Sequence, residues 1–137
     1  MSRPAKPLEL AAAELARRDL SPARLAARLQ ARGVPADEAA EAVERLEAAG
    51  YVDEARLAAA RAETLAARGW GDAGIRADLE AQGCGADTVE AALAGLEPEG
   101  ERARQLVVRL GPGARTARRL AAKGFGEDSL EAAFTAS

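Results

Sequence analysis

The stretch SPARLAARLQARGVPADEAAEAVERL (residues 21–46) decides the fold, because the chain repeats its pattern twice. A shift of 50 residues aligns it with GDAGIRADLEAQGCGADTVEAALAGL (71–96), and a further shift of 41 aligns it with PGARTARRLAAKGFGEDSLEAAFTAS (112–137). The matching positions include Leu29, Leu79 and Leu120, then Gly33, Gly83 and Gly124, then Asp37, Asp87 and Asp128, and then Ala42, Ala92 and Ala133. Self-similarity at a period of roughly 20–50 residues is typical of repeat proteins.

Each copy predicts three helices, because Ala, Leu, Glu and Arg dominate the chain and all four are strong helix formers. The first helices are expected over about 8–18, 54–68 and 99–110, the second over about 22–32, 72–82 and 113–123, and the third over about 37–48, 87–96 and 127–135. The sequence therefore predicts an all-α chain of three tandem three-helix repeats. Their expected bounds are 8–52, 53–97 and 98–137, and stacking of the repeats would make an elongated, bow-like solenoid.

Local signals predict where the second and third helices begin and end. Ser21 followed by Pro22 is typical of a helix start, and the glycine after each second helix suits a left-handed C-terminal position. We expect Asp37, Asp87 and Asp128 to act as N-caps of the third helices. The residue after each glycine is expected to tuck under the turn; these residues are Val34, Cys84 and Phe125.

The apolar pattern of the second helices predicts one buried face. Leu25 and Leu29 lie four residues apart, and Ile75 and Leu79 repeat that spacing. In the third copy Thr116 replaces the first member of the pair, which predicts a weak point in the packing. Apolar residues make up 48% of the chain but aromatic residues only 3%, so we expect thin, alanine-lined helix contacts.

Composition excludes several classes of function. The chain has no histidine and a single cysteine, so Ser-His-Asp and Cys-His nucleophiles, most zinc sites and an internal disulfide are ruled out. Phosphate-binding glycine loops are also missing, since GWGDAG (69–74) follows a predicted helix and is expected to be a turn. We therefore expect no catalytic residues, no cofactor and no metal. The lone cysteine, the lack of a signal-peptide pattern and the lack of a long apolar run favour a soluble cytoplasmic protein.

Basic residues recur on two of the second helices, although the net charge is −3. The two sets are Arg24, Arg28 and Arg32 in the first copy, and Arg115, Arg119 and Lys123 in the third. A four-residue step keeps side chains near one face, so each set predicts a stripe about 12 Å long. Segment 98–123 carries seven cations against two acids, whereas the middle copy has no cation at the stripe positions.

These stripes have two interpretations. They are a solvated helix face, or they are a docking surface for phosphates or for an acidic protein. A shortage of aromatic residues weakens the case for nucleic-acid binding by stacking. Trp70 is expected to pack in its turn, with a partner contact as the alternative, and Cys84 is expected to be a small core residue, with a reactive thiol as the alternative.

The stretch LARRDLSPARLAARLQARGVPADEAAEAVERLEAAGYVDEARLAAA (15–60) resembles the opening of the RecX family, regulators of the bacterial RecA recombinase. The marks are the helix ending LARR, the S-x-x-x-L-x-x-x-L-x-x-x-G segment, the acidic helix and GYVDEARLA. RGWGDAGIRADLEAQG (68–83) resembles the family's R-G-x-G-x-x-x-I-x-x-x-L-x-x-x-G pattern, and RTARRLAAKGFGEDSLEAAF (115–134) resembles its C-terminal repeat. The resemblance covers about residues 8–134. Leu57 stands where the family usually has an aromatic residue, and Asp72 stands where it usually has proline.

The resemblance implies a bow of three-helix repeats that lies in the groove of the RecA–DNA filament. It implies inhibition of ATP hydrolysis and strand exchange without catalysis, by a monomer whose contacts with DNA are weak and made through phosphates. The expected contact residues are Arg18, Arg24, Arg28, Arg32, Arg68, Arg76, Arg109, Arg115, Arg118, Arg119 and Lys123. The alternative is a helical repeat protein that binds nucleic acid through its basic stripes, independently of RecA.

Overall fold

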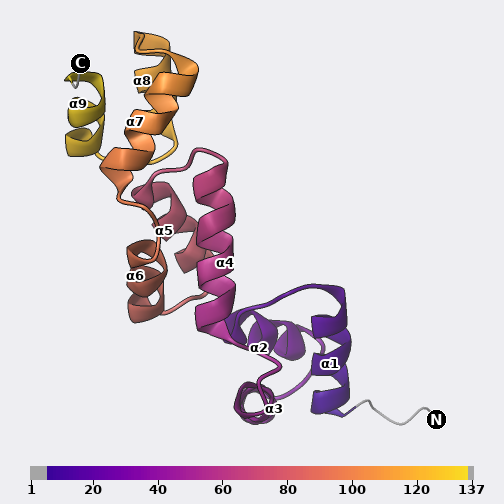
Figure 1. The fold of residues 1–137 in the computed structure, drawn as a ribbon. Helices are drawn as coiled ribbons and strands as arrows, with labels where there is room; N and C mark the ends of the chain where they lie inside the picture. The colour runs from indigo at the N-terminus through magenta and orange to yellow at the C-terminus, as the bar shows by residue number, and fades with distance from the viewer. Residues whose placement is uncertain (1–5, 136–137) are drawn as a thin grey trace. The chain divides into compact units, whose positions relative to one another are not determined.

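The computed structural model describes residues 6–135, and within that range it contains helices and no strands (Figure 1). The helices are α1 (Pro7–Arg17), α2 (Pro22–Ala31), α3 (Ala36–Ala48), α4 (Glu54–Ala67), α5 (Asp72–Ala81), α6 (Ala86–Ala94), α7 (Glu99–Leu110), α8 (Ala114–Ala122) and α9 (Glu127–Thr135). Each lies within two residues of the helix predicted from the sequence. The all-α prediction is confirmed.

Backbone contacts divide the chain into two compact units. The first unit runs to Leu57 and also holds Gln82–Cys84, and the second holds Ala58–Ala81 together with the chain from Gly85 onward. The division into three repeats at the expected bounds stays a prediction, as does the bow-like stacking.

The core of the first unit is built on the buried face of α2. Leu25 and Leu29 are fully buried there, as their four-residue spacing predicts, and they pack with Ala11, Ala39 and Val43 from α1 and α3. Burying a leucine side chain contributes about 1.5–3 kcal/mol, whereas the alanines contribute mainly close approach between helices. The contacts between helices are therefore thin, and each large apolar residue contributes a large share of the stability of the unit.

The second unit buries the matching positions of α5 and α8. Ile75, Leu79 and Leu120 are almost completely buried, and Leu120 packs in a cluster with Leu106 and Phe125. Thr116 is buried as well, although its hydroxyl makes it a poorer core residue than the leucine or isoleucine of the other copies. Val34, Cys84 and Phe125 are all buried, which confirms the prediction that they tuck under the turns.

The glycines after α2 and α8 adopt the left-handed conformation that their position predicts. Gly33 has φ 93° and Gly124 has φ 95°. In each case the next residue closes the helix end, with the Val34 N–H donating to the Leu29 carbonyl at 3.0 Å and the Phe125 N–H to the Leu120 carbonyl at 3.1 Å. These are the hydrogen bonds of a Schellman C-terminus.

At helix starts, the structure confirms one predicted cap and corrects three. The Ser21 hydroxyl accepts a hydrogen bond from the Arg24 N–H at 3.1 Å, as an N-cap should. The N-caps of α3 and α6 are instead Pro35 and Gly85, and neither makes a side-chain capping bond. Helices α3 and α6 start one residue earlier than predicted and α9 starts at Glu127 as predicted, and in all three the expected cap lies inside the first turn, where a carboxylate still favours the helix dipole. The displaced residues are Asp37, Asp87 and Asp128.

A close backbone crossing in the second unit joins the start of α5 to the end of α8. The Gly71 N–H donates to the Lys123 carbonyl at 2.9 Å, and the Ala73 N–H donates to the Gly124 carbonyl at 3.1 Å. A Cβ atom at Gly71 would overlap the backbone of Phe125. The glycine-rich segment is thus the turn that was predicted, and its glycines also allow two main chains to touch.

Candidate functional site

Four cations without a carboxylate partner in residues 6–135 are grouped on α8 and at its C-cap. We call Arg115, Arg118, Arg119 and Lys123 the α8 cluster. Thr116 and Leu120 turn into the core, whereas the three arginines are exposed and Lys123 is half-buried. Arg115, Arg119 and Lys123 follow one another at four-residue steps, which is about 6 Å of helix rise per step. They form the stripe that the sequence predicts.

The α8 cluster has no carboxylate within salt-bridge distance anywhere in residues 6–135. The ion pairs of the described chain involve other arginines, on α2, α4, α5 and α7. An unpaired guanidinium on a helix surface keeps its full capacity for charge-assisted hydrogen bonds to phosphate or carboxylate. The cluster is therefore chemically suited to an anionic partner.

The matching stripe in the first unit is partly neutralised. Nη1 of Arg28 lies 3.4 Å from Glu14 Oε2, and Nη2 of Arg32 lies 3.3 Å from Glu14 Oε1. Glu14 is only 4% exposed, so its carboxylate needs these cations. Arg24 is exposed and has no carboxylate partner among the described residues. The α2 stripe therefore has one unpaired cation and two that stabilise their own unit.

The repeat pattern explains why α8 differs. Arg28 of the first copy aligns with Asp78 of the second and Arg119 of the third. Asp78 forms an ion pair with Arg61 of α4. In the third copy the position of Glu14 is taken by Gln105, whose amide donates to Glu97 at 3.0 Å. Within residues 6–135, no carboxylate forms an ion pair with Arg119.

Of the remaining predicted contact residues, Arg76 forms an ion pair within the described chain, whereas Arg18 and Arg68 do not. Arg76 forms an ion pair with Glu90 at 2.9 Å; this hydrogen bond raises the pKa of Arg76 and lowers the pKa of Glu90. Arg18 and Arg68 are exposed residues following α1 and α4, and no carboxylate of the described chain pairs with either. The structure thus places Arg76 in an internal contact and leaves Arg18 and Arg68 unpaired.

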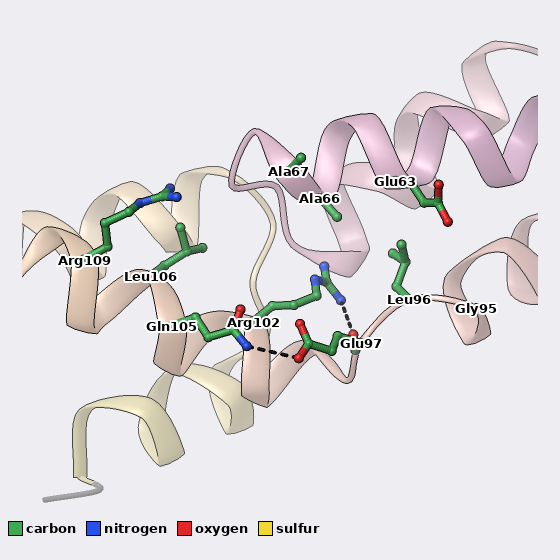
Figure 2. A pocket seen from close by; sticks show the side chains of 10 residues that line it. All are labelled: Glu63, Ala66, Ala67, Gly95, Leu96, Glu97, Arg102, Gln105, Leu106 and Arg109. Atoms are coloured by element: carbon green, nitrogen blue, oxygen red, sulfur yellow. Dashed lines mark hydrogen bonds between the residues drawn. The ribbon is translucent and has the colours of Figure 1, made fainter.

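Arg109 lines a surface pocket of about 410 Å³ in the second unit, which Figure 2 shows. Glu63 and Glu97 also line this pocket, and the Arg109 side chain lies apart from both (Figure 2). Arg102 also lines the pocket, but its guanidinium is engaged by Asp72 and by the Glu97 and Trp70 carbonyls, so the lining has no excess of free positive charge to attract a phosphate. We therefore exclude this pocket as a phosphate site and treat Arg109 as an exposed surface cation.

Arg102 belongs to the same basic segment, but the structure shows that it holds loops together. It is 8% exposed, and Nη1 contacts the Asp72 carboxylate at 2.9 Å and the Glu97 carbonyl at 3.1 Å. Nη2 donates to the Trp70 carbonyl at 3.0 Å. A count of cations along the sequence does not separate such an internal arginine from a surface one.

Glu99 is a second structural residue that the sequence did not single out. Its carboxylate accepts hydrogen bonds from the Asp72 N–H at 2.6 Å, the Ser129 hydroxyl at 2.7 Å and the Gly126 N–H at 3.0 Å. Burial alone would raise the pKa of the Glu99 carboxyl, but these donors outweigh it and hold the pKa below its usual value. One carboxylate thereby ties the start of α5 to the start of α9.

Trp70 lies beside the α8 cluster. Its ring is half-buried, and Nζ of Lys123 sits 5.1 Å from the ring centroid. A cation over an aromatic face is an electrostatic attraction that water weakens but does not abolish. The Trp70 ring therefore packs in the turn, as the sequence predicts, and also contacts the Lys123 ammonium.

Residues 6–135 hold no candidate metal site and no candidate membrane-spanning helix. No group of three or more metal-ligating side chains occurs in this range. None of its helices is both long enough and apolar enough to cross a lipid bilayer.

No family model matches the chain, but individual proteins do. The regulatory protein RecX of Xanthomonas axonopodis pv. citri (strain 306) is 38% identical, over 93% of this chain and 85% of the relative. The regulatory protein RecX of Stenotrophomonas maltophilia (strain R551-3) is 35% identical, over 93% of this chain and 84% of the relative.

Solved structures show the same fold. A crystal structure of a regulatory protein RecX matches with a TM-score of 0.76 at 20% identity, over 93% of this chain and 69% of that one. The crystal structure of RecX from Lactobacillus salivarius matches with a TM-score of 0.78 at 17% identity, over 91% of this chain and 90% of that one.

Proposed function

The chain belongs to the RecX family of regulatory proteins, and we propose that it binds the RecA–DNA filament and inhibits ATP hydrolysis and strand exchange by the recombinase. The protein acts by occupying the filament and catalyses no reaction. It works as a cytoplasmic monomer in homologous recombination, DNA repair and the SOS response.

The observation that carries this proposal is the unpaired α8 cluster. A filament of protein on DNA offers phosphates, which attract guanidinium and ammonium groups and release counterions when they are neutralised. Four cations that are not neutralised within residues 6–135 can contribute to such binding without first breaking an internal ion pair. The cluster is therefore the principal contact surface.

The other exposed cations add weaker contacts. Arg18 and Arg24 of the first unit, and Arg68 and Arg109 of the second, are the further unpaired members of the predicted set. Several weak contacts carried by one chain add up, because the first contact raises the effective concentration of the next. Arg28, Arg32 and Arg76 contribute less, since each is engaged by a carboxylate of its own chain.

The test is the DNA-dependent ATPase of the cognate RecA, measured with increasing amounts of this protein. We expect the wild-type protein to inhibit, and the triple variant Arg115→Glu, Arg119→Glu, Lys123→Glu to lose most of the inhibition with unchanged helical circular dichroism. The matched control is Arg17→Glu, Arg45→Glu, Arg56→Glu, which changes the net charge equally at exposed sites outside the predicted surface. An equal loss of inhibition in the two triple variants would show that net charge alone matters, and full inhibition by both would show that the α8 cluster is not the contact surface.

A second candidate function is nucleic-acid binding that does not involve RecA. The α8 cluster supports this candidate, because the phosphates of bare DNA can pair with its cations without any contact from RecA. Fluorescence anisotropy of labelled DNA separates the two: tighter binding to RecA-coated DNA supports the filament, and equal affinity for bare DNA at the same salt concentration supports the alternative.

A further inference from the structure

The main chain of Trp70 is anchored at the start of the turn before α5. Its backbone N–H donates to the Leu65 carbonyl at 3.1 Å, and its backbone carbonyl accepts a hydrogen bond from Arg102 Nη2 at 3.0 Å. Ring atom Cε3 lies against Gly74, where an added Cβ atom would approach it to 3.3 Å. Packing against Gly74 and the contact with Lys123 restrict the ring, so a partner that packs on it loses less conformational entropy of the protein than on a free side chain.

A depression of about 320 Å³ lies beside this ring. Its lining consists of Trp70, Ala73, Gly74, Ala122, Lys123 and Gly124. Apart from the tryptophan and the lysine, no lining side chain is larger than a methyl group. The depression is therefore bounded by one aromatic ring and one lysine side chain. Its other lining residues are small enough to leave room for a flat ring.

Lys123 connects this depression to the α8 cluster. It is the C-cap of α8, one helical turn beyond Arg119. Its ammonium sits over the Trp70 ring in the free protein and has no carboxylate partner in the described chain. When a ring stacks on Trp70, the ammonium can turn to a phosphate attached to that ring.

We propose that Trp70 and Lys123 form a site for one unpaired nucleobase and its phosphate, with Arg119 and Arg115 holding the adjoining backbone. The site deepens the proposed function by naming single-stranded DNA as the nucleic acid that α8 contacts, and it rests on that function only in taking α8 as the contact surface. A base can stack on a protein ring only when its face is free, and in duplex DNA both faces are covered by neighbouring pairs. The second unit therefore binds single strands in preference to duplexes.

The experiment uses the intrinsic fluorescence of the full chain, because Trp70 is its only tryptophan. An oligodeoxythymidine and an abasic oligomer of equal length carry the same phosphates, and only the first carries bases. We expect the thymidine oligomer to quench and shift the emission at low salt, and the abasic oligomer to bind with little change in emission. Equal responses to the two oligomers, or no response to either, overturns the proposal.

Variants separate stacking from charge. Trp70→Leu should bind labelled oligodeoxythymidine roughly tenfold more weakly and leave binding of the abasic oligomer unchanged. Trp70→Phe keeps a ring and should retain most of the affinity, which also shows that the fold tolerates a change here. If Trp70→Leu binds both oligomers as the wild type does, the ring is not a contact.

The RecA-filament proposal and the nucleobase site can be contradicted independently of each other. A wild-type protein that inhibits the RecA ATPase but responds equally to both oligomers retains the proposed function and loses this site. A protein that shows the base-dependent response but does not inhibit RecA retains the site and loses the filament proposal.

Discussion

The buried carboxylate of Glu14 lies 3.4 Å from the guanidinium of Arg28, and this contact closes the seam between α1 and α2. Arg32 reaches the other oxygen of the same carboxylate at 3.3 Å. Arg119 occupies the position of Arg28 in the third copy and forms no ion pair within residues 6–135. Gln105 aligns with Glu14 in the third copy, but it is exposed and donates to Glu97, so Arg28 is a structural cation and Arg119 is an available one.

The Glu14 contact predicts a stability effect that depends on its partners. Arg28→Ala combined with Arg32→Ala leaves a buried carboxylate uncompensated and should lower the free energy of unfolding by about 1–2 kcal/mol, below the value for a fully buried pair because the arginine side chains are 36% and 48% exposed. Urea denaturation measures the loss. Adding Glu14→Gln to the double variant should restore part of it; if the third change has no effect, the carboxylate does not need the arginines.

Placing an acid at the Glu14 position of the third copy should weaken the candidate site. Gln105→Glu places a carboxylate at the sequence position of Glu14, and repulsion from Glu97 disfavours the contact that Gln105 now makes, which adds an acid to the surface of α7. We expect weaker inhibition of the RecA ATPase and a salt dependence of DNA binding reduced by about one phosphate contact. Gln105→Ala is the matched control and should leave both unchanged. Identical salt slopes for the Glu and Ala variants would contradict the expected effect of the added acid.

The close backbone crossing predicts which glycines tolerate a side chain. Gly71→Ala should destabilise the second unit by roughly 1–3 kcal/mol or more, because its Cβ atom would overlap the backbone of Phe125. Gly100→Ala is the control: nothing lies within 4 Å of its added Cβ atom, and alanine in a helix is favoured by roughly 0.5–1 kcal/mol. Thermal unfolding should show opposite shifts in Tm. Equal shifts would mean that the crossing is not as close as the structure has it.

The hydrogen bonds to Glu99 predict a pH dependence of stability. The pKa of this carboxyl is lowered by folding, so its contribution is fully present above the unfolded value of about 4.3 and is lost as the pH falls through the lower folded value. The free energy of unfolding should therefore decrease on acidification below about pH 5. Glu99→Gln should reduce that slope in urea titrations at a series of pH values, with Glu127→Gln as the control for loss of one exposed carboxylate. A slope unchanged in Glu99→Gln would assign the acid sensitivity to other groups.

The local structure of this protein follows from short-range patterns in its sequence. Helix propensity, the repeat of apolar positions and the glycines after α2 and α8 depend on interactions within a few residues, and the structure confirms the predicted helices and the left-handed Gly33 and Gly124. The capping aspartates were predicted wrongly, because a helix start depends on the backbone path of the preceding loop, which side-chain preference does not determine. Family membership was likewise readable from the order of the motifs.

The availability of each cation depends instead on contacts made in the folded protein. Arg28, Arg76 and Arg102 resemble Arg119 in the sequence, yet each meets a carboxylate brought close by folding, and Arg102 is also buried. The same holds for Trp70, which becomes a neighbour of Lys123 through a backbone crossing between segments some fifty residues apart. Charge pairing falls off with distance in space, whereas helix formation depends on near neighbours in the chain. A stripe of cations can therefore be read from the sequence, and its freedom to bind cannot.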